Sequence, residues 1–138
     1  MKIAGYDGGR LDKRAIVKEK ENVLAGQTTV YDMEMSSLVM KVWDWFDQHD
    51  LHDPVMQMVK VQEEVGELAH EISRARYDTP EVVDALGDTL VTIIGMCHHL
   101  GIETGFALHT AYNEIKDRTG KEIDGSFVKE ENDSRKED

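Results

Sequence analysis

Cysteine is nearly absent from this sequence, since Cys97 is the only one among 138 residues. A single cysteine cannot form a disulfide within the chain, so a reducing, cytoplasmic setting is expected. Cys97 lies in a strongly apolar stretch, which favours packing over a role as nucleophile. Residues 1–22 are charged and contain glycine, unlike a signal peptide. No stretch approaches the roughly 20 apolar residues of a membrane span, so we expect no membrane partner.

Basic residues are also scarce. The sequence has 16 Lys and Arg against 28 Asp and Glu, a net charge of −12. Nucleic acids and anionic membranes are bound by clusters of Lys and Arg, so we expect no nucleic-acid partner. A small phosphorylated substrate is still compatible with this charge, because carboxylates can bind a divalent cation that in turn binds the phosphates.

Only two prolines occur, Pro54 and Pro80. Each follows a capping residue, which is typical of a helix start, and the sequence therefore predicts an all-α fold. Apolar residues at helical spacing predict four helices and a later turn. These are about Met33 to Gln48 after a cap at Asp32, Asp53-Pro54 to about Arg76, Thr79-Pro80 to Leu100 before Gly101, about Glu103 to Thr119 before Gly120, and a turn at Asp124-Gly125.

Three segments are expected along the chain. Residues 1–30 show no sustained period and are interpreted as an N-terminal arm, and residues 31–129 as one helical domain. Residues 130–138 are almost all charged or polar, which predicts a disordered tail. The stretch from Leu90 to Cys97 is apolar nearly all round its helix, which indicates burial on most sides. In so small a chain this predicts a subunit interface and a homo-oligomer.

The second expected helix carries an acidic rim. At about 100° per residue, one arc of about 60° holds Lys60, Glu64, Glu67 and Glu71. The arc borders an apolar stripe that consists of Met58, Val61, Val65, Leu68 and Ile72. On the same wheel, Glu63 and His70 turn further toward solvent.

The third expected helix repeats this pattern. Glu81, Asp84 and Asp88 fall within an arc of about 60° that also borders the apolar stripe. If the two stripes pack together, two acidic rims converge, and their mutual repulsion is relieved by a bound cation. Oxygen ligands favour Mg²⁺ or Mn²⁺. The alternative, equally open from the pattern alone, is that these carboxylates form an ordinary solvated face.

Two short motifs on these helices resemble those of the MazG-like nucleotide pyrophosphohydrolases. The run from Gln57 to Ala69 contains Glu64-x-x-Glu67 and resembles the first family signature, E-x-x-E. The run from Asp84 to Val91 resembles the second signature, E-x-x-D, with Asp88 as its final aspartate. Ala85 stands where the family has glutamate. Asp84, one turn before Asp88, is expected to replace it, with Glu81 in reserve.

A third segment, from Ala111 to Lys121, resembles the C-terminal family motif that faces the phosphates. The resemblance thus covers about residues 36–129. It implies that the phosphates are bound by Asn113, Lys116, Arg118 and Lys121. Lys60 is expected either to contact phosphate or to form a salt bridge with Glu64. Trp43 is the expected base-stacking residue, since an aromatic face can stack on a base.

Taken together, the resemblance implies a four- to five-helix bundle that hydrolyses nucleoside triphosphates, NTP or dNTP, to monophosphate and pyrophosphate. Family members form dimers and tetramers, and a house-cleaning role in the nucleotide pool is plausible for them. The implied catalytic residues are Glu64, Glu67 and Asp88. The implied Mg²⁺ ligands are Glu64, Glu67, Asp84 and Asp88, with Mn²⁺ as a possible substitute.

Two other functions remain open. A di-iron carboxylate bundle uses Glu-x-x-His on facing helices, and Glu67 and His70 have that spacing once. The second alternative is a non-enzymatic helical protein whose acidic surface binds a basic partner. The pair His98-His99 does not share a helix face, and we interpret both as helix-end residues.

Overall fold

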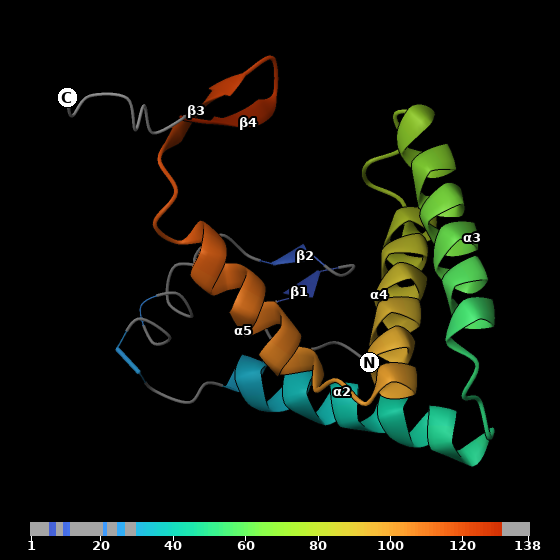
Figure 1. The fold of residues 1–138 in the computed structure, drawn as a ribbon. Helices are drawn as coiled ribbons and strands as arrows, with labels where there is room; N and C mark the ends of the chain where they lie inside the picture. Colours follow the sequence, from blue (N-terminus) through green and yellow to red (C-terminus); the bar gives the residue numbers. More distant parts are fainter. Residues whose placement is uncertain (1–5, 8–9, 12–20, 22–24, 27–29, 131–138) are drawn as a thin grey trace. The chain divides into compact units, whose positions relative to one another are not determined.

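The computed structural model describes residues 6–7, 10–11, 21, 25–26 and 30–130. This part of the chain is mostly helical, which confirms the all-α class in its coarse sense (Figure 1). The elements are β1 Tyr6–Asp7, β2 Arg10–Leu11, α2 Val30–Gln48, α3 Pro54–Ser73, α4 Pro80–Leu100, α5 Thr104–Ile115, β3 Gly120–Ile123 and β4 Ser126–Lys129. Apart from Glu130, the expected tail lies outside the described residues, as does most of the expected N-terminal arm.

Both proline-led helices begin where the sequence predicts. The Asp53 carboxylate accepts hydrogen bonds from the backbone N–H groups of Val55 at 2.9 Å and Met56 at 3.2 Å. The Thr79 hydroxyl accepts one from Val82 at 3.4 Å. These caps satisfy donors that have no partner inside the helix. α4 ends at Gly101, whose φ of 65° is the left-handed conformation that favours glycine.

Other boundaries differ from the prediction. α2 begins at Val30, so position 32 lies inside the helix and is not its cap. α3 ends at Ser73, short of Arg76. α5 ends at Ile115, and Gly120 begins a β-hairpin in place of ending a helix. The predicted turn is confirmed: Asp124 (φ 50°) and Gly125 (φ 79°) form the two-residue loop of that hairpin. Its strands have four residues each, too short to show a clear period.

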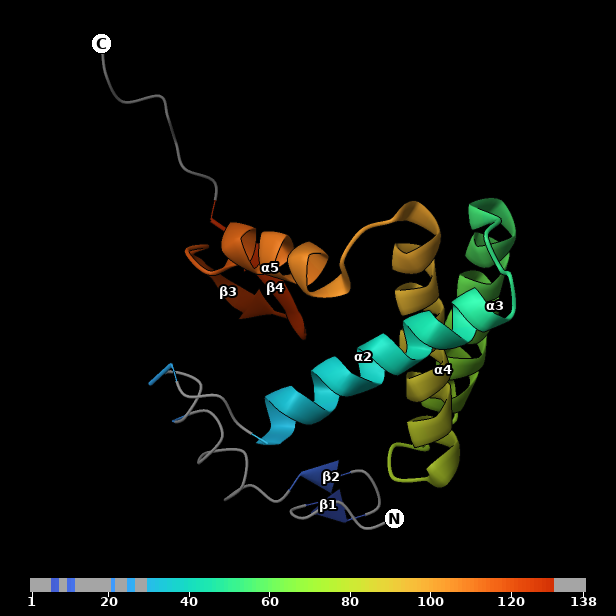
Figure 2. The same cartoon turned by 90° about the horizontal axis from the view of Figure 1, so that it is seen from below.

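The chain forms two compact units, residues 1–102 and 103–138. In the first unit α3 and α4 run antiparallel side by side, and α2 lies across one end of this pair (Figures 1 and 2). The buried apolar side chains are Phe46, Val61, Val82 and Ala85. The second unit comprises α5 and the β3–β4 hairpin. The expectation of one helical domain over 31–129 stays a prediction.

The buried face of α3 is rotated from the predicted one. Gln57 and Val61 are buried and Leu68 is half-buried, whereas Met58, Val65 and Ile72 are exposed. The centre of the buried face is therefore rotated from the centre of the predicted stripe by about 60°. The predicted stripe was right for Val61 and Leu68, but it did not include the buried Gln57. The rotation also turns Glu64 and Glu71 inward, where both are half-buried.

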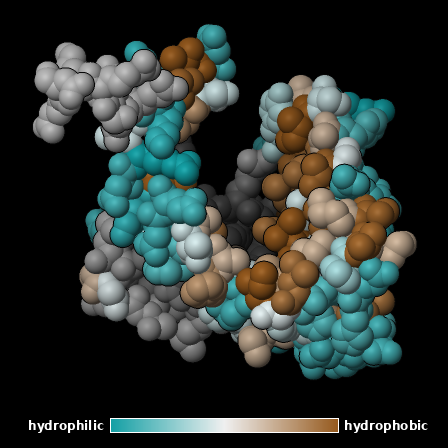
Figure 3. Space-filling model, in the orientation of Figure 1, coloured by the Kyte–Doolittle hydropathy of each residue, from teal (hydrophilic) through white to brown (hydrophobic). Residues whose placement is uncertain are grey.

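A row of apolar side chains on α4 is exposed in the single chain. Val83, Leu86, Leu90 and Ile93 are each more than two-fifths exposed at spacings of three and four residues. The expectation that this helix is buried on most sides is therefore not met within one subunit. Apolar side chains accordingly gather on the surface over α3 and α4 (Figure 3). Among the described helices none alone could span a membrane, and α4 and α5 pass that test only together, by length and composition.

Candidate functional site

An acidic groove of about 490 Å³ lies between α3 and α4. Gly66 and Ala85 line it together with seven titratable side chains. These are Glu63, Glu67, His70 and Glu71 from α3 and Glu81, Asp84 and Asp88 from α4. The structure thus brings Glu67, Asp84 and Asp88 together, with Glu81 beside them. Because the helices are antiparallel, residues early in α4 lie opposite residues late in α3.

Glu63 and His70 line this groove and are both exposed, in agreement with the helical wheel. The rotation of α3 brings these two positions, which precede Glu64 and Glu71, nearer to α4. Both residues were noted in the sequence, but their place in the same groove as the acidic rims was not predicted.

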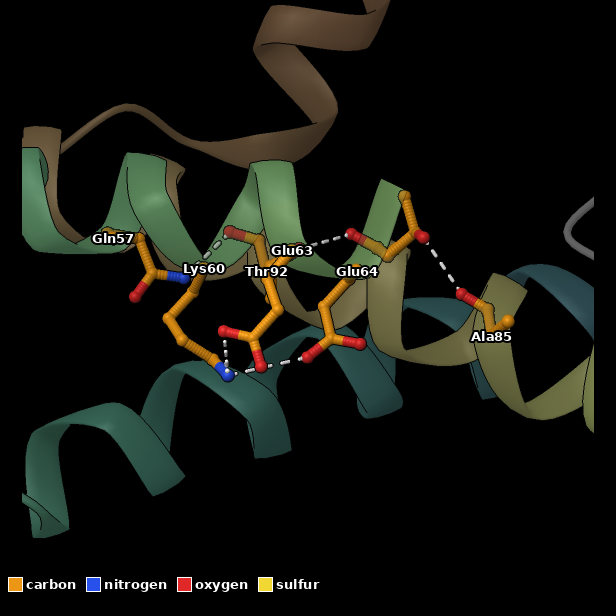
Figure 4. A network of polar contacts seen from close by, with 7 residues as sticks. Gln57, Lys60, Glu63, Glu64, Ala85 and Thr92 are labelled. Carbon is orange, nitrogen blue, oxygen red and sulfur yellow. Dashed lines mark hydrogen bonds and ion pairs between the residues drawn. The ribbon is translucent and has the colours of Figure 1, made fainter. Parts of the chain in front are cut away.

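Glu64 does not line the acidic groove. It lines a second cavity between the helices. Its side chain is only 14% exposed, and the Lys60 ammonium lies 3.6 Å from its Oε1 atom. Lys60 also donates a hydrogen bond of 2.9 Å to Glu63 (Figure 4). This hydrogen bond, with the negative charges of Glu63 and Glu64, raises the pKa of Lys60 above its ordinary value. Lys60 was expected either to contact phosphate or to pair with Glu64, and the structure contains the salt bridge with Glu64.

The second cavity, which we call the apolar pocket, has a volume of about 750 Å³. Its walls are mainly Trp45, Phe46, Leu51, Met56, Val59 and Val91. Polar groups lie among them, which are Asp50, His52, Asp53, Gln57, Lys60, Glu64, Asp88, Thr92 and His99. Asp88 lines both this pocket and the acidic groove, so the two cavities adjoin at its side chain.

Trp45, and not the predicted Trp43, lines the apolar pocket. Trp43 is half-buried and packs edge-on against His98, with ring centroids 5.2 Å apart. The sequence favoured Trp45 for the core, yet it is 47% exposed. Its ring stacks on His49 at 4.2 Å and meets Phe46 edge-on.

The packing of two residues of the apolar pocket, Phe46 and Gln57, depends on a glycine. Gln57 donates a hydrogen bond of 2.9 Å from Nε2 to the backbone carbonyl of Thr92. A Cβ atom at Gly95 would overlap Phe46 and would lie 2.7 Å from Gln57 Nε2. Glycine at this position therefore lets α2 and α3 approach α4 closely, and it holds two pocket residues in place.

The donor set of the groove fits a hard cation, because its carboxylates offer oxygen ligands. Within the described residues, no three His, Cys, Asp or Glu side chains are already gathered as a metal site. Carboxylates that face each other repel in the absence of a cation, which favours a spread arrangement. Ala85 is buried and carries no ligand atom, whereas its neighbour Asp84 lines the groove.

The remaining predicted residues belong to the second unit. Asn113 is hydrogen-bonded to His109 at 2.9 Å, and Arg118 lies 3.9 Å from Glu114. Lys116 follows the last residue of α5, and Lys121 pairs with Val128 in the hairpin. The expected contacts of these four residues with phosphates stay predictions.

Comparisons with protein-family models, with curated proteins and with solved structures find no match for this chain. Three further pocket residues were not anticipated from the sequence: Gln57, His52 and His99.

Proposed function

We propose that this protein hydrolyses nucleoside triphosphates to nucleoside monophosphate and pyrophosphate in a magnesium-dependent reaction, as its MazG-like motifs imply. The observation that carries the proposal is the junction of an acidic groove and an aromatic-walled pocket at Asp88. A nucleoside triphosphate has one flat, largely apolar end and one highly charged end. The two cavities match these ends in polarity, provided that a cation stands between the carboxylates and the phosphates.

The acidic groove would hold the metal. Glu67, Asp84 and Asp88 are the proposed ligands, with Glu64 joining them from the adjoining pocket. When bound there, Mg²⁺ offsets charge on the phosphates and lowers the pKa of a bound water. Glu81 also lines the groove and is the reserve ligand for the glutamate that Ala85 replaces.

The chemical step is the attack of water on the α-phosphorus. A bond forms between the water oxygen and this phosphorus, and the bond to the bridging oxygen of the β-phosphate breaks, so pyrophosphate leaves. One proton of the water passes to a nearby carboxylate. We assign this role to Glu63, which lines the groove and is half exposed. Its Oε2 atom accepts the Lys60 hydrogen bond, which leaves Oε1 for the water.

A homo-oligomer, dimer or tetramer, forms part of the proposal. It is supported by the exposed apolar row on α4 and by Met58, Val65 and Ile72 on α3. Burying such side chains contributes roughly 1.5–3 kcal/mol each relative to leaving them in water. A role in removing unwanted nucleotides from the pool would follow from the activity.

One observation favours the di-iron alternative. His70 lines the same groove as Glu67, so both members of the single Glu-x-x-His pair face one cavity. Iron in the purified protein, with a visible absorption band, would support this alternative. Full activity in iron-free protein with Mg²⁺ would exclude it as the function.

Pyrophosphate release from a panel of NTPs and dNTPs, with and without Mg²⁺, tests the proposal. The Glu67→Gln variant removes one proposed ligand charge and is expected to lower kcat at least 100-fold. Glu34→Gln is the matched control, because Glu34 is exposed on α2 outside both cavities. Folded wild-type protein that releases no pyrophosphate from any nucleotide with Mg²⁺ present would refute the proposal. Equal activity in both variants would refute the assignment of Glu67.

A further inference from the structure

His98, at the end of α4, is a half-buried residue whose side chain packs among rings. Its side chain is 5% exposed. The imidazole stacks between Phe46, at 5.6 Å, and His52, at 5.8 Å. Trp43 and His99 meet it edge-on. This packing fixes the plane of the ring, and with it the directions of both ring nitrogens.

Both nitrogens of His98 have partners. Nε2 lies 2.6 Å from Oδ1 of Asp47 on α2, and Nδ1 lies 3.3 Å from Nδ1 of His99. A carboxylate can only accept a hydrogen bond, so the proton is on Nε2 of His98. In the neutral imidazole Nδ1 then carries a lone pair and accepts from His99. Asp47 thereby sets the tautomer of His98, which sets that of His99.

The last residue in this series of hydrogen bonds, His99, reaches the apolar pocket. When Nδ1 of His99 donates, its Nε2 atom carries a lone pair and is a hydrogen-bond acceptor. His99 lines the pocket. We call the series Asp47–His98–His99 the histidine relay. Asp47 does not line the pocket, but through the relay it makes His99, which does, a hydrogen-bond acceptor.

Gln57 supplies a second acceptor. The residue is 7% exposed, and its amide nitrogen is directed to the Thr92 carbonyl. A backbone carbonyl cannot donate, so this orientation of the amide is required. The amide oxygen then points away from Thr92 (Figure 4). Buried polar atoms need partners, and a ligand in the pocket can provide one for this oxygen.

We propose that the apolar pocket binds the base of the nucleotide and selects bases whose edge supplies two N–H hydrogens, namely cytosine, adenine and guanine. The amino group, or the adjacent N–H groups of guanine, donates to His99 Nε2 and Gln57 Oε1. Uracil, thymine and hypoxanthine present a carbonyl oxygen and a single N–H on that edge, so one acceptor faces an oxygen and stays without a donor. This inference rests on the proposed function and adds the substrate class.

Matched pairs of nucleotides test the selection. CTP and UTP, like ATP and ITP, differ in the exocyclic group and in the protonation of one ring nitrogen. We expect kcat/KM to be about 10- to 100-fold higher for the amino member of each pair, as an unsatisfied buried acceptor implies. Ratios below threefold in both pairs overturn the inference. Pyrophosphate release from no nucleotide would instead refute the proposed function, and then calorimetric binding of CMP and UMP still tests the pocket.

Two variants test the relay. His99→Phe keeps a flat ring but removes the acceptor, so the CTP/UTP ratio is expected to fall at least threefold. Asp47→Ala acts at a side chain that is 65% exposed and should lower the same ratio. Asp44→Ala is the matched control, one turn earlier on α2, where Asp44 accepts a hydrogen bond from Gln48. An unchanged ratio in both His99→Phe and Asp47→Ala, with thermal melting showing folded protein, overturns the relay.

Discussion

Replacing Gly95 by alanine tests the close packing on which the apolar pocket depends. The added Cβ would overlap the Phe46 ring, lying 2.6 Å from Cε2, and would lie 2.7 Å from Gln57 Nε2. Phe46 is 3% exposed and Gln57 is 7% exposed, so neither side chain can swing into open solvent. Part of α2 or α3 must therefore move away from α4.

Two opposing effects decide the magnitude. Alanine stabilises a helix interior by about 1 kcal/mol relative to glycine. Overpacking a core costs about 1–3 kcal/mol, and two simultaneous overlaps place this site at the upper end. We expect a net loss of about 1–2 kcal/mol in the free energy of unfolding. For a unit of about 100 residues this lowers Tm by roughly 4–16 °C.

Gly87→Ala on the same helix is the matched control, because a Cβ there meets nothing within 4 Å. Without a clash the helix propensity acts alone, so this variant should gain about 0.5–1 kcal/mol. Chemical denaturation of wild type and both variants measures the difference. If Gly95→Ala is as stable as Gly87→Ala, the described packing of Phe46 and Gln57 against α4 is wrong.

Two further predictions concern the nucleotide. The protein has two tryptophans, and only Trp45 lines the pocket, so nucleotide-dependent quenching of fluorescence should survive Trp43→Phe and disappear in Trp45→Phe; the reverse result would return the base-binding role to Trp43. Lys60→Met should raise KM severalfold, because it removes the cation expected to contact phosphate, and should leave stability nearly unchanged, since exposed ion pairs contribute little. Because its pKa is raised, the Lys60 ion pair persists through the ordinary titration range of lysine and is lost only as the pH rises through the higher pKa. Lys41→Met, exposed on α2, is the control, and an equal rise of KM there would contradict the role of Lys60.

The sequence predicted the features of this fold that depend on neighbouring residues. Asp53-Pro54 and Thr79-Pro80 start α3 and α4 because capping needs only a side-chain oxygen and the next few N–H groups. Gly101 ends α4 for an equally local reason. The acidic residues of both rims were recognised for the same reason, since their spacing along one helix is visible in the sequence.

Features that depend on packing between helices were not predictable. The rotation of α3 depends on the fit of Gln57 and Val61 against α4, and a broad apolar stripe does not reveal it. The same rotation moved Glu64 into the apolar pocket and Glu63 into the groove. The histidine relay joins residues 51 positions apart, so the helix-end interpretation of His98 described its place in the sequence but missed its contacts.

Product analysis in oxygen-18-labelled water tests the central claim most directly. Wild-type protein, Mg²⁺ and CTP are incubated in the labelled water, and the products are identified by mass spectrometry. Attack on the α-phosphorus predicts label in the nucleoside monophosphate and unlabelled pyrophosphate. Nucleoside diphosphate with labelled orthophosphate, or label in pyrophosphate, would contradict the account.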